Sequence, residues 1–300
     1  MRFLVTGGAG FIGSNLAKRL SARGDEVVAV DDFSRGHWAN LANFAGDVVA
    51  LKSFDDLDSI TSLGPFDAIF HQASMTGVVA ADGTDLTGPD LQRAMLRNNV
   101  ETFRGLLNWA AATKARMIWA SSCSIYGRGP APMRESQPPD PLNVYAFSKM
   151  VMERLAAGYA TKLAHPIVGL RYTNVYGPGE DHKGKLASMV HQLAKQMRGG
   201  KRPRIFKAGE QKRDFVYIDD CVEANLCALK APQSGVFNVG CGRAFTFNQL
   251  VAELNRALKT ALDPEYFDNP YGFTQDWTEA DLTQAGRILG YKPRFDLATG

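Results

Sequence analysis

A tyrosine and a lysine, Tyr145 and Lys149 in the run YAFSK, are the pair of residues whose spacing most clearly indicates chemistry. Residues four apart on a helix lie on one face, so both side chains can reach the same site. The lysine ammonium can lower the pKa of the phenol from about 10 towards neutral pH. A phenolate tuned in this way can take a proton from a hydroxyl while hydride leaves the same carbon. Because this spacing occurs by chance on many helices, the prediction depends on the segments around it.

Serine hydroxyls precede this pair in the segment SSCSIYG, residues 121–127, where a predicted strand ends. At that strand end the hydroxyl of Ser122 could orient a substrate oxygen and the Tyr145 phenol, with Ser124 as a further substrate contact. The alternative is a turn in which the serines satisfy their own backbone. The Tyr–Lys pair about twenty residues later favours the catalytic interpretation. Asn99, on the preceding predicted helix, is a candidate for holding a water in the proton route.

A glycine-rich segment, TGGAGFIG at residues 6–13, follows the first predicted strand and opens the first predicted helix. Gly7 permits the tight turn, Gly10 lets the backbone approach a pyrophosphate, and Gly13 allows the helix to pack closely on the strand. The N–H groups at the helix start, next to Phe11 and Ile12, would face the phosphates. This context predicts a dinucleotide site.

Acidic residues at the end of the second predicted strand indicate which dinucleotide is bound. The carboxylates of Asp31 and Asp32 could bond ribose hydroxyls and would repel a 2′-phosphate, which favours NAD. Arg35 follows closely and could pair with that phosphate, so NADP stays open as an alternative. We expect further cofactor contacts from Gln72, Ala73, Ser74, Asn99, Tyr145, Lys149 and Tyr172.

Short apolar runs alternate with helical patterns over the first half of the chain, which predicts βαβ units. Such units build a parallel sheet covered on both faces, and ligands bind at the carboxyl ends of its strands. We therefore expect an α/β fold with a Rossmann-type doubly wound sheet over residues 1–172. The predicted strands cover 3–6, 26–31, 48–53, 68–71, 116–122 and 167–171, and the predicted helices cover 12–21, 91–113 and 144–161.

The pattern changes after residue 172, where turns and shorter elements predict a smaller α/β domain over residues 173–300. We expect the first domain to bind the cofactor, and the second to bind the substrate and close over the first. The second domain should contain helices near 186–198, 219–230 and 246–259 and short strands near 204–206 and 236–239, and the segment 292–297 should lead into another helix.

The composition of the 300 residues, 45% hydrophobic and 22% charged, is that of an ordinary globular protein. A net charge of +3 argues against a nucleic-acid binder, although residues 198–213 carry a local excess of basic side chains that suits a diphosphate. The four cysteines lack a paired motif, which predicts reduced thiols, a cytoplasmic location and no metal site. No apolar run approaches the roughly 18 residues that span a bilayer, and no signal-peptide pattern opens the chain.

Several segments together resemble the extended short-chain dehydrogenase/reductase superfamily and, within it, the NAD-dependent epimerase/dehydratase family. These segments are TGGAGFIG (6–13), SSCSIYG (121–127), YAFSK (145–149), LRYTNVYGP (170–178) and RDFVYID (213–219). Most similar to the ADP-glycero-manno-heptose 6-epimerase family are the segments 143–149, 171–178, 182–188 and 212–217. The resemblance covers essentially the whole chain, and it implies a homodimer that pairs the helices near 91–113 and 144–161.

The resemblance implies an enzyme that inverts one carbon of a nucleotide-diphosphate sugar. The cofactor removes hydride from one face, and hydride returns to the other face of the keto intermediate. One phenol cannot reach both faces, so a second acid/base is needed. In the resembled family this group is a lysine whose position matches Lys183. A second lysine of that family, whose position matches Lys149, holds the nicotinamide ribose. The expected catalytic residues are Ser122, Tyr145, Lys149 and Lys183.

The resemblance also implies that residues after 172 bind the sugar nucleotide. Asn174 and Arg213 should meet the diphosphate, with Lys185 and Arg204 as helpers. An alternative role for Arg213 is a surface ion pair with Asp214. The remaining expected substrate contacts are Ser122, Ser124, His182, Lys183, Phe206 and Tyr271.

Two other functions stay open from the sequence. A 4-epimerase acting on a UDP- or GDP-sugar needs only Ser122, Tyr145 and Lys149, so Lys183 would take no part in its chemistry. A non-catalytic dinucleotide-binding sensor of the same fold is the second alternative, although such proteins usually lack the Tyr–Lys pair. The stretch between residues 74 and 99 is longer than in the heptose epimerases, and Gln192 lies slightly out of register with their polar substrate contacts. The sequence therefore leaves the sugar, the base and the inverted carbon undetermined.

Overall fold

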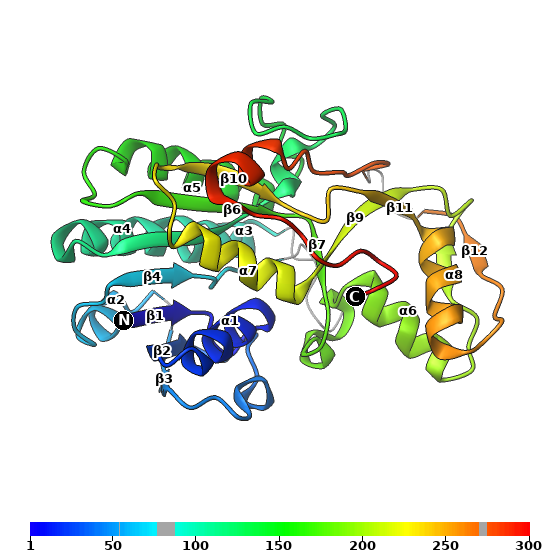
Figure 1. Cartoon of the computed structure of the whole chain (residues 1–300), viewed down its shortest axis with the longest axis horizontal. Helices are drawn as coiled ribbons and strands as arrows, with labels where there is room; N and C mark the ends of the chain where they lie inside the picture. Colours follow the sequence, from blue (N-terminus) through cyan, green and yellow to red (C-terminus); the bar gives the residue numbers. More distant parts are fainter. Residues whose placement is uncertain (54, 77–87, 270–274) are drawn as a thin grey trace.

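A parallel sheet of seven strands forms the centre of the larger part of the molecule (Figure 1). The computed structural model describes residues 1–53, 55–76, 88–269 and 275–300. Across the sheet the strand order is β10-β6-β5-β4-β1-β2-β3, and every neighbouring pair is parallel. The strands are β1 (Arg2–Thr6), β2 (Glu26–Asp31), β3 (Asp47–Ala50), β4 (Ala68–His71), β5 (Arg116–Ser122), β6 (Ile167–Tyr172) and β10 (Gly235–Val239).

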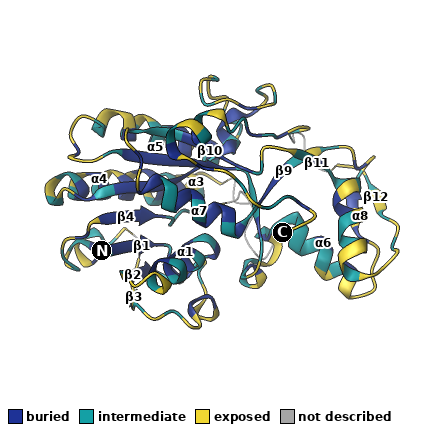
Figure 2. Cartoon of the chain, in the orientation of Figure 1, coloured by how far each residue is buried: buried dark blue, intermediate teal, exposed yellow. Residues whose placement is uncertain are grey.

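Both faces of this sheet are buried because apolar side chains alternate to both sides of the central strands. In β1, Phe3 and Val5 point into one core and Leu4 points into the other. Figure 2 shows the strands buried between two layers of helices. The layers consist of α1 (Phe11–Ala22) and α7 (Ile218–Ala228) on the first core, and of α2 (Leu57–Thr61), α4 (Thr102–Thr113) and α5 (Val144–Tyr159) on the second. The predicted α/β fold with a doubly wound, Rossmann-type sheet is confirmed.

The predicted helix near 91–113 is continuous but irregular in its middle. It consists of α3 (Pro89–Leu96), a π-helical turn η2 (Arg97–Glu101) and α4. Such turns inside helices frequently occur at functional sites. Here the turn carries Asn99, which is fully buried between the loop after β4 and helix α5.

The smaller part of the molecule has its own sheets and core. Three strands pair in the order β11-β9-β7, and two more pair as β12-β8. Helices α6 and α8 pack on them around Leu193, Phe215 and Leu250. These elements are β7 (Asn174–Tyr176), β8 (Arg204–Phe206), β9 (Lys212–Tyr217), β11 (Ala244–Thr246), β12 (Glu265–Phe267), α6 (Met189–Arg198) and α8 (Phe247–Leu258).

The chain returns to the large sheet after it has entered the smaller part. β10 lies beyond the predicted boundary at residues 172 and 173, yet it pairs with β6 and forms an edge of the large sheet. α7 likewise packs against α1 on a face of that sheet. The two parts are therefore not contiguous stretches of sequence.

Hydrogen bonds of two side chains, Ser188 and Asp220, determine the backbone conformation at two places where the prediction differs from the structure. The helix expected at 186–198 starts only at Met189, because the hydroxyl of Ser188 accepts a backbone N–H and caps it there. The segment 292–297, expected to lead into another helix, leads into a turn at 297–299. The N–H groups of Arg294 and Phe295 instead bond to the buried carboxylate of Asp220 at 2.9 and 3.0 Å.

Short helical turns carry several residues of interest. They are the 3₁₀ turns η1 (Trp38–Leu41), η3 (Cys123–Tyr126) and η4 (Asp181–Leu186) and the π turn η5 (Ala285–Leu289). Within the described ranges, none of the helices combines the length and the apolar composition that crossing a bilayer requires.

Candidate active site

The glycine-rich turn joins β1 to α1, and backbone packs so closely around it that side chains at Gly7 and Gly13 would clash with that backbone. A Cβ at Gly13 would lie 2.1 Å from the carbonyl oxygen of Gly7, and a Cβ at Gly7 would lie 2.7 Å from the nitrogen of Ala73. Gly7 also has a φ of +66°, which residues with side chains rarely adopt. α1 begins directly after Gly10, which has no side chain to cap it, so the helix start is suited to an anion.

A cavity of about 380 Å³ opens beside this turn, and we call it the cofactor cavity. A smaller cavity of about 90 Å³ shares several of its residues and extends to the end of β2. An extended dinucleotide bound to the glycine turn would occupy both. The predicted cofactor residues in the two linings are Gly7, Gly10, Phe11, Ile12, Gly13, Asp31, Asp32, Arg35, Gln72, Ala73 and Ser74.

The two aspartates at the end of β2 have different surroundings. Asp31 is buried, and its carboxylate accepts the N–H groups of Ala9 at 2.9 Å and Phe33 at 2.8 Å. Burial raises the pKa of Asp31, and these hydrogen bonds oppose the rise. Asp32 accepts the N–H and the hydroxyl of Ser34 at 2.9 and 2.6 Å. Both carboxylates stand where a ribose is bound in this fold.

Ser122, Tyr145 and Lys149 come together at the end of β5. Helix α5 starts at Asn143, whose side chain accepts a backbone N–H from the first turn at 2.8 Å. This cap fixes the start of the helix that carries Tyr145. The hydroxyl oxygen of Ser122 accepts the N–H of Ser124 at 3.1 Å, which leaves its own proton free to donate to the Tyr145 oxygen.

The pKa values of this cluster differ from the sequence prediction. Burial raises the pKa of Tyr145, and the hydrogen bond with Ser122 opposes the rise. Burial lowers the pKa of Lys149 to about 7, although Glu153 opposes this. The Lys149 ammonium donates to the carbonyl of Ala120 at 2.7 Å and lies 5.7 Å from the centre of the Tyr145 ring. The prediction that Lys149 lowers the phenol pKa is wrong for the protein alone, because burial disfavours the charged form of both groups.

Asn99 connects this cluster to the loop that follows β4. Its side chain donates to the carbonyl of Met75 at 3.0 Å and accepts the N–H of Met75 at 2.8 Å. It also donates to the hydroxyl of Ser148 at 3.0 Å, and Ser148 donates to the carbonyl of Tyr145 at 2.7 Å. The side chain of Asn99 thus holds loop and helix together, and its role in holding a water stays a prediction.

A buried ion pair beneath the cluster escaped the sequence analysis. Glu153 on α5 accepts two N–H groups of Arg171 on β6, at 2.6 and 2.8 Å. Glu153 also accepts the hydroxyl of Ser121 at 2.6 Å, and Arg171 donates to the hydroxyl of Tyr126 at 2.7 Å. These bonds tie α5 to the strand ends beside Ser122. The available signal was an arginine inside the apolar run of β6, since such residues are seldom buried without a partner.

Lys183 lies on η4, at the border between the cofactor cavity and a second, larger cavity. Its ammonium bonds to the buried carboxylate of Glu180 at 2.9 Å. The same ammonium lies 4.8 Å from the centre of the ring of Phe11, the first residue of α1. The side chain is 25% exposed, so a bound molecule in either cavity can reach it.

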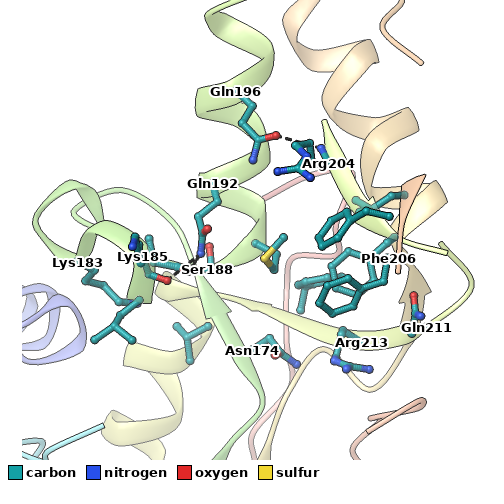
Figure 3. Close-up of a pocket in the computed structure, with 18 residues that line it drawn as sticks. Asn174, Lys183, Lys185, Ser188, Gln192, Gln196, Arg204, Phe206, Gln211 and Arg213 are labelled. Atoms are coloured by element: carbon teal, nitrogen blue, oxygen red, sulfur yellow. Dashed lines mark hydrogen bonds between the residues drawn. The ribbon is translucent and has the colours of Figure 1, made fainter. Parts of the chain in front are cut away.

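The larger cavity, which we call the substrate cavity, has a volume of about 680 Å³ and is lined by residues of β7, η4, α6, β8, β9, α8 and β12 (Figure 3). The predicted substrate residues in its lining are Asn174, Lys183, Lys185, Arg204, Phe206 and Arg213. Gln192 also lines it, as its place in the sequence suggested. Sequence analysis missed Gln196, Gln211, Phe247 and Phe267. Gln196 could have been found from its position one helical turn after Gln192, whereas the others come from separate segments.

Strand alternation separates Arg213 from Asp214 on β9. Arg213 faces the substrate cavity, 5.9 Å from the centre of the Phe247 ring. Burial lowers the pKa of Arg213, although Asp276 opposes this. Asp214 is buried and accepts the N–H of Cys241 at 2.7 Å. The alternative of a surface ion pair between Arg213 and Asp214 is therefore wrong.

Most of the chain matches one known family. Residues 3–240 match the NAD dependent epimerase/dehydratase family. The chain belongs to this family. An ADP-L-glycero-D-manno-heptose-6-epimerase of Alkalilimnicola ehrlichii is 38% identical over 318 residues, which cover 99% of this chain and 94% of that protein.

Crystal structures of other proteins resemble this member of the epimerase/dehydratase family over the whole chain. The ADP-L-glycero-D-manno-heptose-6-epimerase of Helicobacter pylori has a TM-score of 0.90 at 39% identity, covering 100% of this chain and 93% of that one. The UDP-glucose 4-epimerase of Thermotoga maritima, solved with UDP-glucose, has a TM-score of 0.90 at 32% identity. The match covers 100% of this chain and 96% of that one. These similarities confirm the predicted family, the prediction of an epimerase and the NAD cofactor.

The residues of this epimerase/dehydratase family member fit NAD. Glycines of the turn line the cavity with backbone alone, and two aspartates stand at the ribose end of the cavity. Tyr172 is different from the other predicted cofactor residues, because it is buried and its hydroxyl bonds to Gln72 at 3.1 Å. Tyr172 therefore contacts a residue that lines the cavity, Gln72, without lining the cavity itself.

Four predicted substrate residues need separate mention. Ser122 and Ser124 lie at the end of β5 and in η3 and are not in the lining of the substrate cavity. His182 lines the cofactor cavity instead of the substrate cavity, and its Nδ1 lies 3.0 Å from Nδ2 of Asn40. Burial lowers its pKa. His182 therefore lies beside the cofactor cavity, and its contact with the substrate stays a prediction. Tyr271 lies outside the described residues.

Proposed function

We propose that this chain is an NAD(P)-dependent epimerase of a nucleotide-diphosphate sugar, of the ADP-glycero-manno-heptose 6-epimerase type. The observation that carries the proposal is the position of Lys183 between the cofactor cavity and the substrate cavity. An enzyme that inverts one carbon by transient oxidation needs an acid/base on each face, and an amine at this border can serve as the second. The similarity to two heptose epimerases supports the same conclusion.

Inversion by transient oxidation requires proton transfer at the substrate oxygen in both half-reactions. Bound NAD would accept hydride from the reacting carbon and later return it. Ser122 orients the substrate hydroxyl, and Tyr145 takes its proton as the carbonyl forms. After the keto sugar has turned, Lys183 gives a proton to the same oxygen as hydride reaches the opposite face. Lys149, beside the phenol, is proposed to hold the nicotinamide ribose.

The substrate cavity has the chemistry that a nucleoside diphosphate requires. Arg213 is a partly buried guanidinium, and such a group binds phosphate through paired hydrogen bonds. Lys185 and Arg204 add positive charge, and Asn174 adds an amide beside them. Phe206 and its neighbouring aromatic rings offer flat apolar surfaces for a base.

We further propose how the parts of the chain divide the work. Residues 1–172, together with β10 and α7, would hold NAD or NADP, and the rest of residues 173–300 would hold the sugar nucleotide. A homodimer would pair α4 and α5 with their copies. The ring of Phe147 on α5, which is 44% exposed, supports an apolar contact there. A cytoplasmic location fits the four cysteines, all of which are free thiols.

The variant Lys183→Ala tests the proposed function. With ADP-glycero-manno-heptose, we expect turnover to fall by about 10²- to 10⁴-fold, the usual contribution of a positioned acid/base. Nuclear magnetic resonance of the product, which distinguishes the two epimers, measures the rate. Lys195→Ala is the control, since Lys195 is an exposed lysine on α6 and should leave turnover unchanged. Full turnover by Lys183→Ala would contradict the proposal.

A UDP- or GDP-sugar 4-epimerase is the second candidate, favoured by the similarity to a UDP-glucose 4-epimerase over the whole chain. That activity needs Ser122, Tyr145 and Lys149 but not Lys183. Conversion of UDP-glucose by the Lys183→Ala variant at the wild-type rate would favour it. If neither ADP-heptose nor any UDP- or GDP-sugar is converted while NAD still binds, the remaining candidate is a dinucleotide sensor.

A further inference from the structure

The loop between Gly177 and Ser188 carries Lys183 and is organised around one buried carboxylate. Glu180 is 1% exposed, although a free carboxylate strongly prefers water. Its Oε1 accepts the hydroxyl of Ser188 at 2.7 Å and the N–H of Gly177 at 3.3 Å. Its Oε2 accepts the N–H of Ser188 at 2.6 Å and the ammonium of Lys183 at 2.9 Å. Three of these donors shape the loop, and the fourth is the amine proposed to act in catalysis.

The ammonium of Lys183 is held from two sides. Glu180 lies on one side, and the face of the Phe11 ring lies 4.8 Å away on another. A lysine side chain is flexible, and a single contact would leave its end mobile. Phe11 is the first residue of α1, so the second contact fixes the ammonium relative to the phosphate-binding turn.

A separate contact ties the same loop to that turn. Nδ2 of Asn40 donates to the carbonyl of Ala9 at 2.9 Å and lies 3.0 Å from Nδ1 of His182. Ala9 belongs to the glycine-rich segment, and His182 immediately precedes Lys183. These contacts therefore fix the position of the loop around Glu180 relative to the cofactor cavity.

From these contacts we propose that Glu180 is the positioning residue of Lys183, an inference that rests on the proposed function. Its carboxylate holds the ammonium at the border of the two cavities, where the amine meets the substrate oxygen. Glu180 itself touches neither substrate nor cofactor and acts through Lys183. The charge of Glu180 is the essential property, because it attracts the ammonium while the neighbouring N–H groups keep it solvated.

The variant Glu180→Gln tests this role with ADP-glycero-manno-heptose as the probe. Removing the charge should let the amine move, and small displacements of a catalytic group can lower rates by about 100-fold. We expect kcat for inversion to fall at least about tenfold with KM nearly unchanged. The reduction of bound NAD by the epimer that Tyr145 oxidises should keep its rate, since Lys183 takes no part in that half-reaction. Asp181→Asn is the control, because Asp181 is an adjacent, exposed carboxylate.

A second variant and a second measurement cover the case in which Glu180→Gln does not fold. Glu180→Asp keeps the charge but shortens the side chain, and it should lower kcat by less than Glu180→Gln. Labelling of Lys183 with an amine reagent, quantified by mass spectrometry with NAD bound, should become several-fold faster in Glu180→Asp than in the wild type. This readout requires no substrate.

The outcomes separate the two proposals. Wild-type inversion rates in both Glu180 variants, or unchanged labelling of Lys183, would overturn the role of Glu180. An equal loss of inversion and of NAD reduction would also overturn it, because a general structural defect lowers both. Full turnover by Lys183→Ala would instead refute the proposed function and leave Glu180 with nothing to position.

Discussion

The cofactor cavity and the substrate cavity differ in what forms them: mainly backbone in the first, and mainly side chains in the second. The cofactor cavity depends on backbone: glycines between β1 and α1, and residues at the ends of β2 and β4. The substrate cavity depends on side chains, among them four amides and four aromatic rings, which come from β7, η4, α6, β8, the turn before β9, β9, α8 and β12. A backbone requirement restricts neighbouring positions in the chain, so it leaves a local sequence pattern. A cavity assembled from separate segments leaves only short patterns in several places, and residues outside them, such as Phe247 and Phe267, carry no signal.

The strongest test concerns the catalytic cluster beside the cofactor cavity. Tyr145→Phe removes the hydroxyl that exchanges the proton, and we expect turnover to fall by about 10²- to 10⁴-fold with the fold intact. Tyr159→Phe on the same helix is the control, because its hydroxyl bonds to Asn108 at the protein surface. Steady-state rates and circular dichroism measure both. Substantial turnover by Tyr145→Phe would show that another group takes the proton.

The backbone character of the cofactor cavity can be tested at Gly13. In Gly13→Ala the added Cβ would lie 2.1 Å from the Gly7 carbonyl oxygen, so the turn must distort. We expect the free energy of unfolding to fall by about 1–3 kcal/mol and stabilisation by NAD to disappear. Thermal melts with and without NAD measure both effects. Gly158→Ala on α5, where nothing lies within 4 Å of the new Cβ, should be stabilised and keep its response to NAD.

The variant Arg213→Ala tests the contribution of side chains to the substrate cavity. Losing one charge-assisted phosphate contact is expected to raise KM for the sugar nucleotide about 10- to 100-fold, which corresponds to roughly 1.5–3 kcal/mol. Binding of NAD, followed by calorimetry, should not change. Arg198→Ala, which removes an exposed arginine from α6, serves as the control. A loss of NAD affinity in Arg213→Ala would mean that the two cavities are not independent.

The smallest expected effect is a pH dependence at Lys149. Burial lowers the pKa of this residue from 10.5 to about 7, so between these values the unfolded chain binds a proton that the folded protein does not. The stability that depends on Lys149 therefore rises as pH increases from about 7 to about 10, and falls as pH decreases again. Relative to Lys149→Met, the melting temperature of the wild type should increase by a few degrees over this range. A pH-independent difference would contradict the lowered pKa.

The sequence predicted the parts of the site that are encoded locally. The Ser122, Tyr145 and Lys149 cluster and the glycine turn follow from spacing. The positions of strands β1 to β6 along the chain follow from apolar runs. The charge states within the cluster did not follow, because the pKa values of Tyr145 and Lys149 depend on burial by distant segments. Glu180 carried no signal at all, since a glutamate in a polar loop is usually exposed.

Long-range pairing accounts for the other differences. β10 joins β6 across about sixty residues, and no local pattern indicates which sheet a short apolar strand will join. The ion pair between Glu153 and Arg171 likewise depends on the packing of α5 on β6. Phe247 and Phe267 line the substrate cavity only after α8 and β12 have assembled.

The return of β10 to the large sheet has a consequence for biosynthesis. A nascent chain that has left the ribosome only as far as β6 exposes the unpaired edge of that strand. The cofactor-binding half can close this edge only after the whole segment from β7 to β9 has also emerged. We expect it to mature late during translation, and until then the open strand is a place where chaperones can bind.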